Sequence, residues 1–119
     1  MTTVTVARLA SLPSPAAITD DLPGWTKVSG HPTMKTYVIH TSADGSMISG
    51  IWEATKGTYR AEYNGFEFVH LLAGKITITP DGGVPVTVAA GDAFVVEPGF
   101  AGTWVIEEPV RKHFTARIK

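Results

Sequence analysis

The chain contains no cysteine among its 119 residues. This absence excludes disulfide bonds, zinc sites built on thiolates and a cysteine nucleophile. Neither sign of charge dominates, because 10 Lys and Arg residues stand against 11 Asp and Glu residues, for a formal net charge of -1. A balanced charge argues against nucleic acid or an anionic membrane surface as a partner.

Extended apolar segments are absent from the sequence as well. No apolar segment approaches the roughly 20 residues that a membrane helix requires. The first residues, MTTVTVARLASLPSPAA, have neither the basic start nor the continuous apolar stretch of a signal peptide. Together with the lack of cysteine, these absences predict a cytoplasmic protein. The length predicts a single domain that can bury its own core.

Glycine and proline, by contrast, are frequent, with 12 and 8 residues, and the segments between them are rich in Val, Ile, Thr, Tyr and Phe. Short segments of this kind are typical of an all-β sandwich or barrel. Residues 1–23 differ in composition and predict an N-terminal arm, with an optional edge strand over residues 4–9, ahead of a barrel over residues 24–119. The predicted strands are 34–40, 47–54, 58–63, 67–73, 75–79, 84–88, 93–96, 103–106 and 110–118.

The strongest local signal is Asn64-Gly65 between two predicted strands, because Asn-Gly favours a two-residue hairpin turn. Such a turn would set Glu62 opposite Glu67, with Arg60 two residues from Glu62 on the same strand. Since side chains alternate along a strand, all three would share one face of the sheet. Two opposed carboxylates beside a guanidinium predict either a solvated charge ladder or a ligand-facing cluster inside a barrel.

Five blocks, in order along the chain, carry a resemblance to a known family. They are GIWEATKG (50–57), YRAEY (59–63), EFVHLLAG (67–74), AGDAFVVEPGFAGTW (90–104) and PVRKHF (109–114). Over roughly residues 24–119 the chain resembles the cupin superfamily, and more specifically the cupin domains of ethanolamine-utilisation proteins and (S)-ureidoglycine aminohydrolase. The resemblance implies a single small double-stranded β-helix, a jelly-roll-like barrel with its site inside.

Ordinary cupins hold a metal ion with two histidines and a glutamate from the first motif and a third histidine from the second. Here the resemblance places Glu67 at the glutamate position, and Arg60, Glu62 and Gly102 at the histidine positions. A guanidinium is always protonated and cannot ligate a metal. We therefore expect no metal and no other cofactor. A hard cation held by the oxygens of Glu62 and Glu67 is the second alternative.

The predicted site combines the hairpin with the resemblance. Glu62 and Glu67 are the catalytic candidates, as acid or base, and Arg60 would hold a ligand carboxylate. Glycine at position 102 would leave free volume at the barrel mouth. The aromatic residues predicted to line the pocket are Tyr63, Trp52, Phe100 and Trp104. A structural ion pair is expected between Lys112 and Glu53.

These expectations predict binding or conversion of a small anionic metabolite in the barrel, in amino-acid or amine catabolism as the resemblance suggests. Whether a reaction is catalysed stays open, and a non-catalytic ligand-binding or accessory module is the first alternative. A metal-dependent enzyme with an oxygen-rich site is the second. Phe68, His70 and Leu72 share the face opposite Glu67, and this apolar outer face predicts a homodimer.

Overall fold

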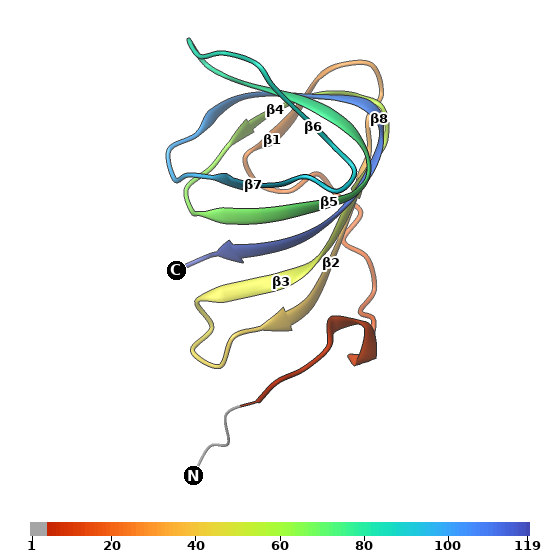
Figure 1. The fold of residues 1–119 in the computed structure, drawn as a ribbon, viewed down its shortest axis with the longest axis vertical. Coiled ribbons are helices and arrows are strands. Elements are labelled where there is room, and N and C mark those ends of the chain that lie inside the picture. The colour runs from red at the N-terminus through yellow and green to blue at the C-terminus, as the bar shows by residue number, and fades with distance from the viewer. Residues whose placement is uncertain (1–4) are drawn as a thin grey trace.

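The computed structural model describes residues 5–119, and its architecture is a single curled sheet of eight strands. A 3₁₀ turn, η1 (Leu9–Ser11), precedes the sheet in the arm that trails away from it in Figure 1. The predicted all-β fold is confirmed. The strands are β1 (Trp25–Ser29), β2 (Met34–Thr41), β3 (Met47–Ala54), β4 (Gly57–Glu62), β5 (Glu67–Pro80), β6 (Val86–Ala89), β7 (Ala93–Val96) and β8 (Ala101–Arg117).

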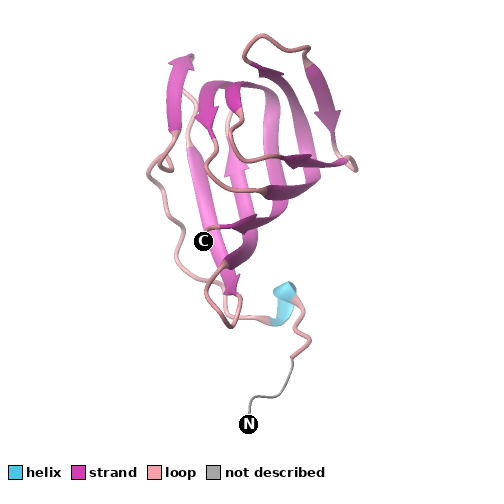
Figure 2. Cartoon of the chain, turned by 90° about the vertical axis from the view of Figure 1, so that its left-hand side faces the viewer, coloured by secondary structure: helices cyan, strands magenta, loops and turns pink. Residues whose placement is uncertain are grey.

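Two long antiparallel strands, β5 and β8, run through the middle of the sheet. The first half of β8 also pairs with β4, and β4 pairs in turn with β1. The second half of β8 pairs with β3, and β3 pairs in turn with β2. The other side of β5 pairs with β7 and then with β6. The sheet therefore rolls into a half-open barrel, as Figure 1 and Figure 2 show, and its concave face holds the core.

The bend in β5 lies at Gly74, where the pairing with β8 is irregular. Gly74 has a φ of 91°, and a Cβ there would lie 2.2 Å from the carbonyl oxygen of Pro109. Only glycine tolerates this left-handed backbone so close to a neighbouring strand. The structure consequently has one bent strand where the sequence predicted two, over residues 67–73 and 75–79.

The predicted hairpin at Asn64-Gly65 is wrong. β4 pairs with β1 and β8, whereas β5 pairs with β6, β7 and β8. The chain between β4 and β5 is tied instead to the loop before β8, since Tyr63 N–H donates to the Phe100 carbonyl at 2.8 Å and Gly99 N–H donates to the Tyr63 carbonyl at 2.8 Å. Pairing of β4 and β5 with the long strand β8 therefore outweighs the preference of Asn64-Gly65 for a two-residue hairpin turn.

Aromatic rings fill much of the concave face. The ring centroid of Trp25 lies 5.3 Å from that of Trp52, 5.7 Å from that of Tyr59 and 5.0 Å from that of Trp104. Tilted and edge-on ring pairs contribute roughly 0.5–1.5 kcal/mol each beyond the area that they bury. These four residues, the aromatic cluster, bring together β1, β3, β4 and β8 and lie beside the candidate site.

The N-terminal arm does reach a sheet edge, but through a different segment from the one predicted. Ile18 and Thr36 exchange two backbone hydrogen bonds, of 2.8 and 2.9 Å. Residues 5–8 form no strand, and Val4 lies outside the described residues, so the optional strand over residues 4–9 is not formed where the structure describes it. The first strand of the barrel, β1, has no counterpart among the predicted strands.

The apolar outer face predicted on β5 is present. Phe68 is 43% exposed, and its neighbour across the strand pair, Val95, is 52% exposed. His70 and Leu72 are half-buried on the same side of the strand. The homodimer that this face would support stays a prediction. Among the described residues, no helix is long and apolar enough to cross a membrane.

Candidate functional site

A cavity of about 640 Å³ opens on the concave face of the sheet. This volume lies within the range of roughly 300–1,000 Å³ that is typical of small-molecule sites. Its walls come from the segment before β1, from β2 and β3, from the chain between β4 and β5, and from the C-terminal part of β8. The walls are mostly apolar, so the few polar groups among them determine what can bind.

Strand register places three inward-facing side chains in one row. Thr36 on β2 lies opposite Trp52 on β3, and Trp52 lies opposite Lys112 on β8. All three are buried, and all three line the cavity. Because neighbouring strands are about 4.8 Å apart, the backbones of Thr36 and Lys112 are roughly 10 Å apart. The polar groups of Thr36 and Lys112 therefore lie along one wall of the cavity, on either side of Trp52.

Lys112 belongs to a hydrogen-bonded triad in which two of the three side chains are almost entirely withdrawn from solvent. Its Nζ donates to Glu67 Oε2 at 2.9 Å, and the Tyr63 hydroxyl donates to Glu67 Oε1 at 2.7 Å. The side chains of Lys112 and Glu67 are 2% and 9% exposed. Removing an ion from water costs several kcal/mol. This triad, Lys112–Glu67–Tyr63, offsets that cost by satisfying both carboxylate oxygens.

Two tryptophan rings enclose the ammonium group of Lys112. Its Nζ lies 4.5 Å from the ring centroid of Trp52 and 4.9 Å from that of Trp104. Burial lowers the pKa of Lys112, and the charge and hydrogen bond of Glu67 partly oppose this. Burial and the Glu67 charge raise the pKa of Tyr63 well above its ordinary value, so its hydroxyl stays protonated and donates near neutral pH.

The hydroxyl of Thr36 is a polar group left without a partner. Thr36 is 2% exposed, and its Oγ1 has no hydrogen-bond partner among the described residues. An unsatisfied buried hydroxyl costs roughly 1–3 kcal/mol. Because Thr36 lines the cavity, a ligand that hydrogen-bonds to this hydroxyl would recover part of that free energy.

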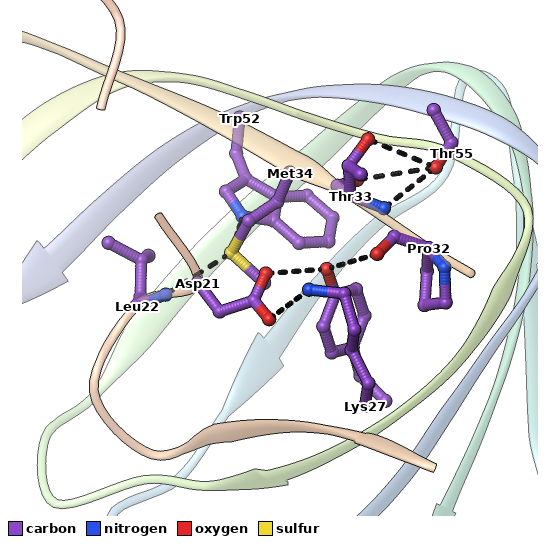
Figure 3. A network of polar contacts seen from close by, with 9 residues as sticks. Asp21, Leu22, Lys27, Pro32, Thr33, Met34, Trp52 and Thr55 are labelled. Atoms are coloured by element: carbon purple, nitrogen blue, oxygen red, sulfur yellow. Dashed lines mark hydrogen bonds and ion pairs between the residues drawn. The ribbon is translucent and has the colours of Figure 1, made fainter. Parts of the chain in front are cut away.

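A polar network connects the segment before β1 to the neighbouring strands, as Figure 3 shows. The Tyr59 hydroxyl donates to Asp21 Oδ1 at 2.7 Å and lies 3.2 Å from the carbonyl oxygen of Pro32. Lys27 forms an ion pair with the other carboxylate oxygen of Asp21. Burial and the neighbouring Asp21 raise the pKa of Tyr59 and keep its hydroxyl protonated. This network fixes the strap, residues 18–24, several of which line the cavity.

We expect Tyr59→Phe to lower the free energy of unfolding by about 1–2 kcal/mol, because Asp21 and the Pro32 carbonyl lose their shared donor. Chemical denaturation measures this change. Tyr37→Phe is the matched control, since Tyr37 is half-buried on β2, and it should change the free energy of unfolding by less than about 0.5 kcal/mol. Equal effects of the two substitutions would contradict a role for this network in holding the strap.

Arg60 and Glu62 lie outside the cavity interior. Ala61 faces the core on β4, so side-chain alternation turns both neighbours outward. The Arg60 guanidinium makes two hydrogen bonds to Asp81, of 3.0 and 2.7 Å, and the Glu62 side chain is 66% exposed at the cavity rim. The predicted cluster of Arg60, Glu62 and Glu67 on one face is therefore wrong.

The four predicted aromatic residues do lie together. Trp52 and Tyr63 line the cavity. Behind them, the ring centroid of Phe100 lies 5.6 Å from that of Tyr63, and the ring centroid of Trp104 lies 6.3 Å from it. Contact of these residues with a ligand, like the acid or base role of Glu67, stays a prediction.

Lys112 was not predicted as a site residue. The expected ion pair with Glu53 is wrong, because Glu53 pairs with Arg111 at 3.5 Å on the outer face. A signal is present in the sequence, where Val110, Lys112 and Phe114 alternate with more polar residues. A lysine at an apolar position of a strand must be buried together with a carboxylate or a ligand.

The residues at the inner face do not fit the metal that cupins commonly hold. Both oxygens of Glu67 are already hydrogen-bonded, and the neighbouring Lys112 ammonium would repel a cation. Free volume at Gly102 is also a wrong prediction, because a Cβ there would lie 2.2 Å from the Thr79 carbonyl oxygen. Within residues 5–119, no three His, Asp or Glu side chains are grouped to hold a metal ion. That no metal binds stays a prediction.

Comparison with known proteins agrees with this fold. The EutQ protein of Clostridium difficile has a TM-score of 0.65 and 17% sequence identity, over 72% of this chain and 68% of that chain. A putative ethanolamine utilization protein from Salmonella typhimurium has a TM-score of 0.62 and 18% identity, over 90% of this chain and 97% of that one. These identities support the shared fold alone.

One further solved structure and one family model match this chain at the level of sequence. A DUF861 family protein from Thermotoga maritima is 31% identical, with a TM-score of 0.53, over 54% of this chain and 73% of that chain. No curated protein matches the sequence. The family model described as "EutQ-like cupin domain" matches residues 41–114, which is more than half of the chain. On this match, the chain belongs to the family of EutQ-like cupin domains.

Proposed function

We propose that this cupin domain binds a small anionic metabolite in its cavity and uses the ammonium of Lys112 where other cupins use a metal. The observation that carries the proposal is the buried Lys112, held by Glu67 and two tryptophan rings at the cavity wall. An ammonium group has three N–H donors, and Glu67 takes one of them. The remaining donors can bind a carboxylate, in surroundings of low polarity that strengthen such a bond.

The charges around the cavity support an anionic ligand. Because Glu67 and Lys112 neutralise each other, the other charged side chains of the lining set the balance. Arg117 and Lys119 are cationic and exposed at the rim, and Glu62 is their single acidic counterpart in the described lining. This positive excess would draw anions toward the opening. The unpartnered hydroxyl of Thr36 offers a further hydrogen bond inside.

Ligand binding without catalysis is the second candidate function. It is favoured by the arrangement of Glu67, whose two oxygens already accept hydrogen bonds from Lys112 and Tyr63. A general base must reach the proton that it abstracts, and this carboxylate is occupied until a ligand rearranges the triad. Turnover of any bound carboxylate would distinguish the enzyme from the binding module.

The test is a screen of small carboxylates by calorimetry and thermal shift, against the unaltered protein and Thr36→Val. The valine has nearly the same shape but lacks the unpartnered hydroxyl. It should raise the free energy of unfolding of the ligand-free protein by about 1 kcal/mol and weaken binding of the best carboxylate by roughly tenfold.

Arg60→Met is the control for this screen, because Arg60 lies on the outer face and is bonded to Asp81. It should leave carboxylate binding unchanged. A screen in which no carboxylate binds would overturn the proposed function. An equal loss of binding in Arg60→Met and Thr36→Val would show that the anion sits elsewhere than in the cavity.

A further inference from the structure

We propose that Lys112 forms a covalent imine with a small oxo acid, a carboxylic acid that also carries a ketone or aldehyde group. This inference rests on the proposed function, because it uses the same cavity and narrows the ligand to carbonyl-bearing acids. It assigns Lys112 as a catalytic residue, since its Nζ would bond directly to the ligand. The observations are the position of the amine, the carboxylate beside it and the polar group across the cavity.

The position of the amine suits attack on a carbonyl. Lys112 lies in the cavity lining, yet its side chain is only 2% exposed, with Trp52 and Trp104 rings on two sides. Enclosure by apolar groups excludes water, which would otherwise hydrolyse an imine. Lysines that form imines with carbonyl substrates are typically desolvated in this way. Burial also lowers the pKa of Lys112, which favours the neutral amine that reacts.

The carboxylate of Glu67 is placed to move the protons of the reaction. Its Oε2 lies 2.9 Å from Lys112 Nζ, so it can accept the proton that the ammonium must lose before it attacks. Its Oε1 accepts a hydrogen bond of 2.7 Å from the Tyr63 hydroxyl. Tyr63 therefore acts as a positioning residue, because it holds the carboxylate in place while the proton is transferred.

The reaction balances without any oxidant or reductant. Lys112 gives one proton to Glu67, and its free amine attacks the carbonyl carbon to form a C–N bond. The carbonyl oxygen takes up the proton released by the attacking nitrogen and becomes a hydroxyl. Glu67 then returns its proton to this hydroxyl, the C–O bond breaks and one water leaves. The products are a protonated imine on Lys112, a restored Glu67 carboxylate and water.

The carboxylate of the ligand has two available interactions. The Thr36 hydroxyl lies across Trp52 from Lys112 and has no partner in the described structure. Arg117 and Lys119 lie at the exposed side of the cavity and carry the opposite charge to the ligand. A molecule that combines a carbonyl with a carboxylate can therefore use the amine and these groups at once.

The experiment treats the full chain with pyruvate, 2-oxoglutarate or 4-oxopentanoate in the presence of borohydride, which reduces an imine to a stable secondary amine. We expect one adduct per chain by intact mass, with the mass of the acid less one oxygen atom. Peptide mapping should place it on Lys112, formed roughly tenfold faster than on any exposed lysine. Lys112→Arg keeps a cation beside Glu67 but cannot form an imine, and should lose the adduct.

Lys75→Arg is the matched control, because Lys75 is exposed, and it should keep the adduct on Lys112. Should Lys112→Arg fail to fold, the peptide map of the unaltered protein still decides the question. Adducts confined to exposed lysines would overturn the imine. Calorimetry with pyruvate and with lactate, which lacks the carbonyl, separates the two proposals. Binding of either acid without an adduct overturns the imine alone, and absence of both binding and adduct overturns both proposals.

Discussion

Lys112→Met should lower the free energy of unfolding by about 3–5 kcal/mol, the typical cost of removing one partner from a buried ion pair. The substitution leaves the Glu67 carboxylate buried with only the Tyr63 hydroxyl as a donor. Chemical denaturation near pH 7 measures the loss. Arg111→Met on the same strand removes an exposed ion pair with Glu53 and should cost less than about 1 kcal/mol.

The double variant Glu67→Gln with Lys112→Met should recover much of this loss, because no unpaired charge is then buried. The coupling free energy between Lys112 and Glu67 from this double-mutant cycle should be several times that from a double-mutant cycle on the Arg111–Glu53 pair. An equal loss of unfolding free energy in Lys112→Met and Arg111→Met would show that the Lys112–Glu67 ion pair is not buried away from water. That result would contradict the proposed site.

The burial of Lys112 also predicts the direction in which stability changes with pH. Burial lowers the pKa of Lys112 in the folded state from its ordinary value of 10.5. Between the folded and the unfolded pKa, the unfolded chain binds more protons, so this residue makes stability rise as pH rises through that window. The double variant should lack this slope. The free energy of unfolding should be measured below about pH 10. Above that pH the unfolded chain loses the Tyr63 proton more readily than the folded protein, so Tyr63 makes stability fall as pH rises.

Gly102→Ala should lower the free energy of unfolding by about 3 kcal/mol or more, at the upper end of what overpacking costs. The added Cβ would lie 2.2 Å from the Thr79 carbonyl oxygen and 2.9 Å from Pro80 Cα, both of them backbone atoms of β5. The two longest strands would have to separate to admit it. A histidine ligand cannot be placed there without the same displacement.

Gly99→Ala is the control for this steric effect. Gly99 has a φ of 92°, but a Cβ there meets nothing within 4 Å. Its substitution should cost only the roughly 1–2 kcal/mol of a left-handed backbone. Chemical denaturation of both variants compares the two costs. A Gly102→Ala protein as stable as Gly99→Ala would mean that β5 and β8 pack less tightly than the structure describes.

The fold class and much of the strand pattern follow from the amino-acid sequence. Frequent glycine and proline between β-branched and aromatic segments reflect backbone preferences that act over a few residues. The predicted strands 47–54 and 93–96 coincide with β3 and β7. Alternation also placed Phe68 on an outer face and Glu67 on the inner one, because side-chain period depends only on the strand itself.

The identity of neighbouring strands and of the charged side chains that pair across them depends on the tertiary fold. The Asn64-Gly65 turn predicts that β4 pairs with β5, yet β4 instead matches six residues of β8, from Gly57 opposite Ile106 to Glu62 opposite Ala101. A ladder of that length pairs the backbone groups of six residues on each strand, whereas a turn preference affects two residues. Arg60 was thereby turned outward to Asp81.

The same long-range pairing brought Lys112 to Glu67, 45 residues earlier in the chain. No local pattern specifies that partner, because the choice depends on how β8 lies between β3 and β5. Alternation along one strand predicts which charged residues share a face, but their partners come from neighbouring strands. The residues of the inner site are consequently brought together by the order of the strands. That order depends on the free energy of the whole sheet and not on any local segment.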